Sequence, residues 1–315
     1  AIEACRDRDA IDIFILHPQG RVSEVQRRQM TTVLADNVHN IAIEGTFDDC
    51  QALLKGAFND LPFRDEVALS AVNSINWARV VAQVVYYVTA ALAAGAPDRK
   101  VSFAVPTGNF GCVFAGYGAA MMGLPIDKLL VATNRNDILH RFFQTGGYRM
   151  DDVFATQSPS MDIQVASNFE RLLFDIDGRD GAVVREQMAA LTAHGGFDVA
   201  PAALKQAHEL FLSHRVDEAA TTATIAEVYA ESGLIIDPHT AVGLRAARDL
   251  LPQGPVITLA TAHPAKFPDA VEKACGQRPA LPAAMGDLYE REERCAVLPN
   301  DLGVLQDHVR KLRRA

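Results

Sequence analysis

The chain alternates short apolar segments with helical segments, and this alternation restricts its fold more than any other feature. Ile11–His17 is rich in β-branched residues and ends at a Pro-Gln-Gly turn, which is typical of a buried strand. Strands separated by helices pair in parallel, so the sequence predicts an α/β fold. The other predicted strands are Val38–Ile43, Lys100–Val105, Ile126–Thr133 and Val256–Ala260, and the predicted helices are Ser23–Leu34, Phe47–Phe58, Asn76–Ala94, Cys112–Met122, Asp137–Thr145, His239–Leu251 and Pro268–Cys275.

The composition is that of an acidic globular protein. With 315 residues, 49% hydrophobic and 22% charged, the chain is neither collagen-like, coiled-coil nor disordered, and its length suggests about two domains. The formal net charge of −9 gives no general attraction for nucleic acid or an anionic membrane, so we expect neither as a partner. An anionic ligand would have to be held by local features such as a helix N-terminus.

Hydropathy and cysteine usage favour a cytoplasmic protein. The longest apolar stretch, near Val80–Ala94, is interrupted by Gln83 and Thr89 and falls short of the ~20 residues of a membrane helix, so we expect a buried helix. The five cysteines are scattered, with no Cys-x-x-Cys pair. This pattern favours a reducing compartment and disfavours disulfides or structural zinc, so we expect no metal site.

The first candidate site is a glycine-rich loop between a strand and a helix. Pro106-Thr107-Gly108-Asn109-Phe110-Gly111 follows the strand Lys100–Val105 and precedes Cys112–Met122. Such a turn collects unpaired backbone N–H groups at the positive end of a helix, where a phosphate binds well. We expect Gly108 and Gly111 to permit positive φ and close approach of a ligand. The loop matches neither a dinucleotide-binding fingerprint nor a P-loop, so a purely steric role for its glycines remains open.

Two further segments place polar residues near strand ends or helix starts. Leu259–Pro268 follows a buried strand and offers His263 as a base and Lys266 as a nucleophile or phosphate contact, although a local backbone contact and a solvated lysine are the more ordinary interpretations. Asn73–Arg79 puts Asn73, Asn76 and Arg79 on one helix face beside Ser74, which suits an oxyanion; a helix cap with a solvated arginine is the alternative.

The segment Ile236–Gly243 reads as the start of a helix. Asp237-Pro238 is ordinary capping chemistry, and we favour that interpretation for Asp237. His239 follows directly and is expected to do no more than pack there.

Taken together, these segments resemble the threonine synthases of bacteria and fungi. The resemblance rests on HPQGRVSEVQRRQMTT, NSINWARVVAQ, PTGNFG, ATNRND, IDPHTAVG and ATAHPAKFP, in this order, and covers nearly the whole chain, most loosely at about 178–200. It implies the tryptophan synthase β-like fold, fold type II of the pyridoxal-phosphate (PLP) enzymes, with two α/β domains that have parallel sheets. We expect residues 1–60 to be the remainder of the smaller domain, and 61–315 to form the large PLP-binding domain with a mostly helical insertion at about 150–232.

The resemblance also implies a reaction and a set of site residues. Threonine synthases convert O-phospho-L-homoserine and water to L-threonine and phosphate, with PLP as the electron sink. By resemblance, Gly108, Asn109, Phe110 and Gly111 bind the cofactor phosphate, and the Thr261 hydroxyl faces the pyridine nitrogen. Ser74, Asn76 and Arg79 are expected to bind the substrate. Cys112 stands where several relatives carry Asn, which puts a side-chain phosphate contact at that position in doubt.

One departure from the family pattern concerns the catalytic lysine. The family's Schiff-base lysine lies in a Phe-Lys-Asp motif, upstream of a Ser/Thr-Gly-Asp-Thr-Gly loop that leads into the helix with which this chain begins. The chain opens on Ala1-Ile2-Glu3-Ala4-Cys5 without a cap, and none of its seven lysines stands in such a motif: Lys55, Lys100, Lys128, Lys205, Lys266, Lys273 and Lys311. We therefore expect the N-terminal part of the enzyme, with the catalytic lysine, to be missing here, and this chain alone to be inactive.

Two other functions compete with this interpretation. The first is a threonine synthase-like phospho-lyase with a different substrate, and the second is a non-catalytic PLP-binding scaffold with a regulatory role. The upstream sequence would distinguish them. The resemblance leaves the oligomeric state open between monomer and homodimer.

Overall fold

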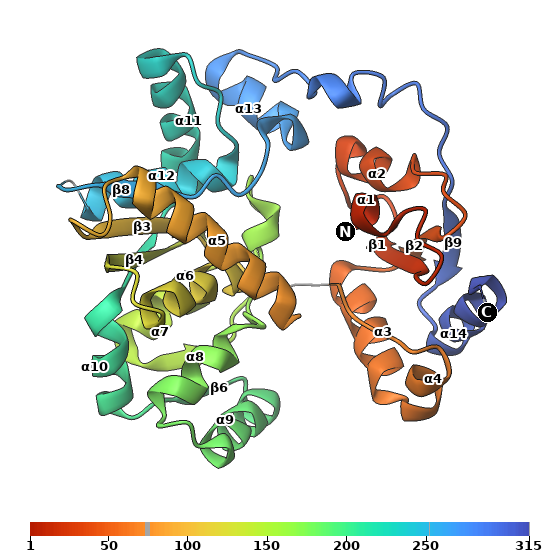
Figure 1. Ribbon diagram of the computed structural model, residues 1–315, viewed down its shortest axis with the longest axis horizontal. Coiled ribbons are helices and arrows are strands. Elements are labelled where there is room, and N and C mark those ends of the chain that lie inside the picture. Colours follow the sequence, from red (N-terminus) through yellow and green to blue (C-terminus); the bar gives the residue numbers. More distant parts are fainter. Residues whose placement is uncertain (73–75, 252, 315) are drawn as a thin grey trace. The chain divides into compact units, whose positions relative to one another are not determined.

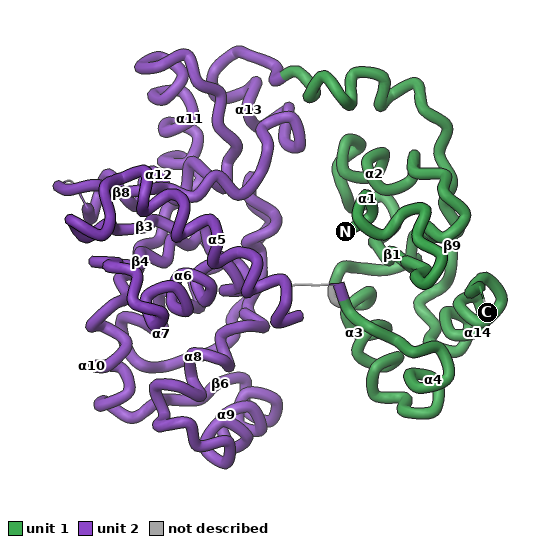
Figure 2. The backbone as a smooth tube through the Cα atoms, in the orientation of Figure 1, with its two compact units in different colours: residues 1–71, 280–315 green, residues 72–279 purple. Residues whose placement is uncertain are grey.

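The computed structural model describes residues 1–72, 76–251 and 253–314, and these form two compact units. Unit 1 consists of Ala1–Ala71 together with Ala280–Ala315, and unit 2 of Val72–Pro279 (Figure 2).

Unit 1 is built on a three-stranded parallel sheet. Its order is β1 (Ile13–Pro18), β2 (Val38–Glu44) and β9 (Ala296–Pro299). The buried side chains Ile41 and Ile43 of the central strand pack on the helices beside it. The helices of the unit are α1 (Ile2–Cys5), α2 (Glu24–Thr31), α3 (Phe47–Asn59), α4 (Leu61–Glu66), the 3-10 turn η3 (Ala283–Met285) and α14 (Leu302–Leu312).

Unit 2 is built on a four-stranded parallel sheet in the order β7, β4, β3, β8. These strands are β3 (Val101–Pro106), β4 (Ile126–Thr133), β7 (Phe211–Arg215) and β8 (Val256–Thr258), and a small antiparallel pair joins β5 (Gly147–Arg149) to β6 (Gly196–Asp198). The helices are α5 (Trp77–Ala93), α6 (Gly111–Met121), α7 (Ile138–Thr145), α8 (Phe169–Ile176), α9 (Gly181–His194), α10 (Pro201–Leu210), α11 (Glu218–Ser232), α12 (Pro238–Leu250) and α13 (Pro268–Cys275), with 3-10 turns η1 (Pro159–Met161) and η2 (Pro264–Lys266).

The large sheet is covered on both faces, as a parallel sheet requires. Side chains along β3 and β4 alternate: Phe103 and Leu129 pack against a cluster that includes α5, α6, α7 and α8, whereas Ala104 packs with α12 on the other face. Figure 1 shows β3 and β4 between these helical layers. Both strands are mostly buried and rich in apolar residues, which explains why they were recognisable in the sequence.

The predicted α/β class with parallel sheets is confirmed, and every predicted strand is present. The region predicted as mostly helical, about 150–232, also contains β7, which forms an edge of the large sheet. Its sequence, Phe-Leu-Ser-His-Arg, is short and half polar because the strand has a partner on one side only. α4, β9 and α14 were not predicted from the sequence.

The observed division of the chain differs from the predicted boundary after residue 60. Residues 61–71 and 280–315 group with the first sixty residues rather than with unit 2. The reason is strand pairing, because β9 adds to β2 in parallel and α14 packs on α3. Within the described parts of the chain, no helix is both long and apolar enough to cross a membrane.

Candidate cofactor and substrate site

The predicted cofactor residues follow two neighbouring strands of the unit 2 sheet. β3 and β8 are parallel, with Ala104 opposite Thr258, so both strands end at the same edge of the sheet. The loop 107–111 leaves β3 there and leads into α6, and Thr261 lies just beyond the end of β8. The carboxyl edge of a parallel sheet is where α/β folds bind ligands.

The loop is held in one conformation by Phe110. This residue has φ 64°, a left-handed conformation that costs a non-glycine residue about 1–3 kcal/mol, and it stands directly before α6. Its ring is 1% exposed and packs against Phe169 and Phe211, with centroids 5.2 and 6.0 Å away. The aromatic cluster therefore keeps the backbone in a strained turn at the start of the helix.

Gly108 is required for space, and neither glycine of the loop for positive φ, which corrects the expectation from sequence. Neither Gly108 nor Gly111 has positive φ. A Cβ built on Gly108 would lie 2.6 Å from the carbonyl oxygen of Ser160, a distance that real Cβ atoms do not adopt. One on Gly111 would lie 3.4 Å from Nδ2 of Asn168. The close approach at Gly108 is therefore to another backbone segment of unit 2.

Asn109 is fixed by two residues at the start of α8. The backbone N–H and the Nδ2 group of Asn168 both donate to the Asn109 carbonyl oxygen, at 3.1 and 3.2 Å. The Ser167 hydroxyl donates to Asn109 Oδ1 at 3.2 Å. Neither partner was predicted from the sequence, because both lie in the region interpreted as a helical insertion.

The first turn of α6 has no side-chain cap, since its N-cap residue is Phe110. Cys112 lies in this turn, where burial raises the pKa of its thiol and Gln83 Nε2 donates to its Sγ at 3.2 Å. This end of α6 thus combines unpaired amides with an uncharged thiol, which suits an anion.

Two of the predicted substrate residues, Asn76 and Arg79, lie at the start of α5, which packs along α6. Asn76 caps α5 by accepting from the Ala78 N–H at 2.9 Å, so the capping interpretation applies to this residue. Arg79 lies one turn before Gln83 and is close enough to Cys112 to act electrostatically on its thiol. Ser74, with Asn73, lies outside the described residues.

The three residues predicted in the loop after β8, Thr261, His263 and Lys266, differ in their surroundings. Thr261 is exposed, as a ligand contact requires. His263 Nδ1 accepts from the Ala265 N–H at 3.2 Å and caps η2, which supports the local interpretation of this histidine. Lys266 is half-buried at the end of η2.

Asp237 caps α12, as its sequence context indicated, but His239 does more than pack. Asp237 Oδ1 accepts from the His239 backbone N–H at 2.9 Å and contacts His239 Nδ1 at 2.8 Å. His239 Nε2 accepts from the Ser160 N–H at 3.2 Å. The histidine therefore joins α12 to the segment that touches Gly108.

A network of amides at the end of β4 was not predicted as functional. Asn134 and Asn136 are buried, and each donates through Nδ2 to Asp162 Oδ1, at 2.8 and 2.9 Å. Asn134 Nδ2 also lies 2.9 Å from Ser158 Oγ. The motif ATNRND, quoted above for resemblance alone, thus anchors the segment 156–162.

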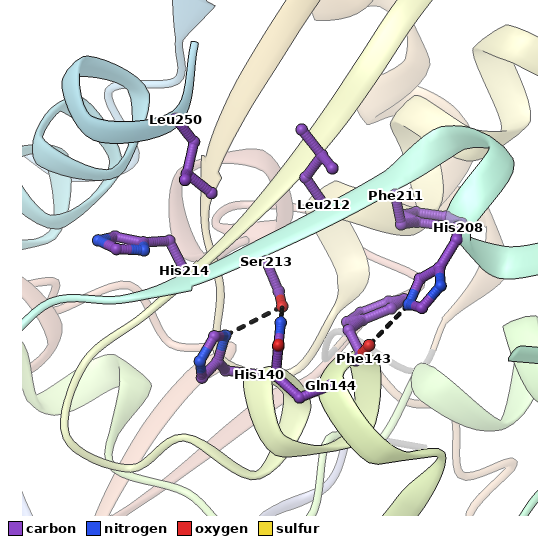
Figure 3. Close-up of a pocket in the computed structure, with 9 residues that line it drawn as sticks. All are labelled: His140, Phe143, Gln144, His208, Phe211, Leu212, Ser213, His214 and Leu250. Carbon is purple, nitrogen blue, oxygen red and sulfur yellow. Dashed lines mark hydrogen bonds between the residues drawn. The ribbon is translucent and has the colours of Figure 1, made fainter.

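A cavity of about 450 Å³ lies at the edge strand β7, away from these residues. His140 and Gln144 converge there on Ser213 Oγ, at 3.0 and 3.5 Å (Figure 3). No predicted site residue lines it, and β4 separates β7 from β3. Among the described residues, no group of three His, Cys, Asp or Glu side chains could hold a metal ion.

Comparison with known proteins identifies the family. The family model described as threonine synthase, C-terminal, matches residues 240–309. The crystal structure of PLP-bound threonine synthase from Brucella melitensis is 56% identical, with a TM-score of 0.94 over 100% of this chain and 68% of that one. The chain belongs to the threonine synthase family.

The similarity to threonine synthases covers nearly the whole chain. The curated threonine synthase of Pseudomonas aeruginosa is 59% identical over 312 residues, covering 98% of this chain and 66% of its own length. The yeast threonine synthase structure is 40% identical, with a TM-score of 0.90 over 99% of this chain and 67% of that one. This chain thus spans about two thirds of the length of its relatives. The predicted fold, tryptophan synthase β-like and of fold type II, is confirmed.

Proposed function

We propose that this chain is the cofactor-binding part of a threonine synthase, which converts O-phospho-L-homoserine and water to L-threonine and phosphate. The observation that carries the proposal is the 56% identity and TM-score of 0.94 to a PLP-bound threonine synthase. PLP is accordingly the proposed cofactor.

The residues of the loop 107–111 fit a cofactor phosphate. The first turn of α6 offers amides that no side chain caps, at the positive end of an eleven-residue helix. Phe110 holds the turn, and Asn168 donates a hydrogen bond to the Asn109 carbonyl. The phosphate would be bound by the backbone N–H groups of Gly108, Asn109, Phe110 and Gly111. Because the net charge of the chain is negative, an anion has to be attracted by such a local group of donors.

Thr261 is proposed to act at the ring nitrogen. When bound, PLP supplies the electron sink for proton removal from the substrate carbons and for loss of the γ-phosphate. A threonine hydroxyl donates a hydrogen bond to a neutral pyridine nitrogen, whereas a carboxylate would favour its protonated form. Thr261 would therefore keep that nitrogen unprotonated.

Arg79 is proposed to bind the phosphate of the substrate, together with Ser74 and Asn76. A guanidinium binds phosphate through parallel N–H donors. Its place one turn before Gln83, on the face of α5 next to α6, supports this role.

The lysine that attaches the cofactor is proposed to lie outside this chain. None of the seven lysines stands in a Phe-Lys-Asp motif, and the relatives are longer than the region matched. On this proposal the chain alone binds PLP without completing the reaction. A cytoplasmic location is proposed as well, on the strength of five unpaired cysteines.

The test uses two glycine substitutions near the start and in the body of α6. Gly108→Ala should weaken PLP binding roughly 5- to 150-fold, because relieving the contact with Ser160 costs about 1–3 kcal/mol. Gly118→Ala is the matched control, since its Cβ would lie 3.9 Å from Val84 Cγ2 in ordinary contact. Each substitution is made in the full-length protein, PLP is titrated into it, and binding is followed by the absorbance of PLP. Absence of PLP binding by the unmodified protein would refute the proposal.

A further inference from the structure

The segment 156–162 touches the phosphate loop without any side chain between them. A Cβ on Gly108 would lie 2.6 Å from the Ser160 carbonyl oxygen and 3.4 Å from Met161 Cα. Interiors this close-packed transmit displacement rather than absorb it. The position of Ser160 and Met161 therefore limits where the loop 107–111 can lie.

His239 holds this segment through a single backbone hydrogen bond. Its Nε2 accepts from the Ser160 N–H at 3.2 Å, so Nε2 carries no proton. The proton is then on Nδ1, which donates to Asp237 Oδ1 at 2.8 Å. The His239 and Asp237 side chains are 3% and 0% exposed, so the bond between them is shielded from water.

The capping of α12 by Asp237 does not explain why His239 is bonded to both Asp237 and Ser160. Among the described residues, Asp180 and Asp217 cap α9 and α11 through backbone amides, and no histidine is bonded to either. Asp237 likewise bonds the His239 and Thr240 amides and the Thr240 hydroxyl, which already satisfies a helix start. The additional feature at α12 is an oriented imidazole that reaches Ser160.

We propose that Asp237 and His239 are positioning residues for the cofactor phosphate: Asp237 sets the tautomer of His239, His239 holds Ser160, and Ser160 sets the loop at Gly108. Asn134 anchors the other side of the same segment through Ser158 and Asp162. The inference rests on the proposed function, because it assigns these residues to the phosphate end of bound PLP.

The test separates the two hydrogen bonds of His239. The His239→Asn substitution places an amide at the position of Nδ1 and keeps the contact with Asp237. Its side chain has no atom at the position of Nε2, so the hydrogen bond with Ser160 is lost. In His239→Gln, the amide oxygen is separated from Cα by the same number of bonds as Nε2 of histidine. It can therefore accept the hydrogen bond from the Ser160 N–H. His239→Asn should weaken PLP binding about fivefold, the effect of one hydrogen bond, and His239→Gln should restore most of it.

Pyridoxal, which lacks the phosphate, distinguishes positioning from general damage. Dissociation constants for PLP and pyridoxal are measured with the full-length protein. We expect His239→Asn to bind pyridoxal as the unmodified protein does. The control is His214→Asn, which removes a different Asp–His contact of unit 2, with Asp249 at 3.1 Å, and should change neither constant.

Two results would overturn the inference. One is unchanged PLP affinity in His239→Asn, and the other is an equal loss of PLP and pyridoxal affinity. If His239→Asn does not fold, hydrogen exchange in the unmodified protein decides: PLP should slow exchange at the Ser160 amide together with residues 109–111, and protection of the loop alone contradicts the inference. Failure of the unmodified protein to bind PLP would instead refute the proposed function.

Discussion

The left-handed conformation of Phe110 predicts an unusual order of stability among its variants. Phe110→Ala removes a ring that is 1% exposed and packed between two other aromatic rings, which should lower the free energy of unfolding by about 3–5 kcal/mol. The alanine variant must still adopt φ 64° at this position. Phe110→Gly loses the same ring contacts but adopts that φ without strain. We therefore expect the glycine variant to be more stable than the alanine variant by about 1 kcal/mol.

Phe142 supplies a control for which the expected difference in stability between the glycine and alanine variants has the opposite sign. It is fully buried, lies within α7, and packs on Phe169 with centroids 4.7 Å apart. In a helix, glycine is less favourable than alanine by about 1 kcal/mol, so Phe142→Gly should be less stable than Phe142→Ala.

Urea unfolding followed by circular dichroism measures both pairs, with the slope m compared to exclude changes in the unfolded state. The reasoning fails if Phe110→Ala is as stable as Phe110→Gly while the Phe142 pair behaves as expected. That result would mean that the turn before α6 is not left-handed in solution, and the loop geometry assigned to the cofactor phosphate would lose its basis.

Three further predictions address the cofactor and the pH dependence. Thr261→Ala should weaken PLP binding about fivefold, by the ~1 kcal/mol of one neutral hydrogen bond; an unchanged dissociation constant argues against its place at the ring nitrogen. Borohydride reduction of the PLP-loaded full-length protein should attach the cofactor to a lysine other than Lys266, because the ring nitrogen assigned to Thr261 and the aldehyde lie at opposite ends of the ring; a modified peptide containing Lys266 contradicts this. Burial lowers the pKa of His140 below its ordinary 6.5, so the fold favours its neutral form and stability falls as pH drops below about 6.5. His140→Asn, which keeps a polar atom near Ser213 Oγ, should reduce that loss in urea unfolding at pH 5.5 relative to pH 7.5.

The two central strands of the large sheet were predicted clearly from the sequence, whereas two strands at sheet edges were missed. Val101–Pro106 and Ile126–Thr133 pack against helices on both sides, so each contains a run of buried apolar residues and their pattern is clear. β7 and β9 lie at sheet edges and carry polar or exposed residues, and their pairing partners are remote in the sequence. The boundary after residue 60 had the same cause, since the pairing of β9 with β2 and the packing of α14 on α3 bring the last part of the chain into unit 1.

The site shows the same limit at the level of single residues. The loop at Gly108 was recognisable because a glycine-rich turn between a strand and a helix is typical of anion-binding loops, although the structure assigns the positive φ to Phe110 and the need for space to Gly108. No local pattern could indicate that Ser160 is the neighbour of that glycine, fifty-two positions away.

The motifs ATNRND and IDPHTAVG acquire a common role only in three dimensions. One ends β4 and the other begins α12, and each looks like ordinary turn or capping chemistry by itself. Asn134 bonds Ser158 and Asp162, and His239 bonds Ser160 between them, so both motifs hold one short segment. That segment presents its backbone, not its side chains, to Gly108, which leaves no trace in its own residue types. The physical constraint therefore falls on the residues that hold the segment, and substitutions at Asn134 or His239 should disturb the loop more than substitutions of the exposed Ser160 side chain.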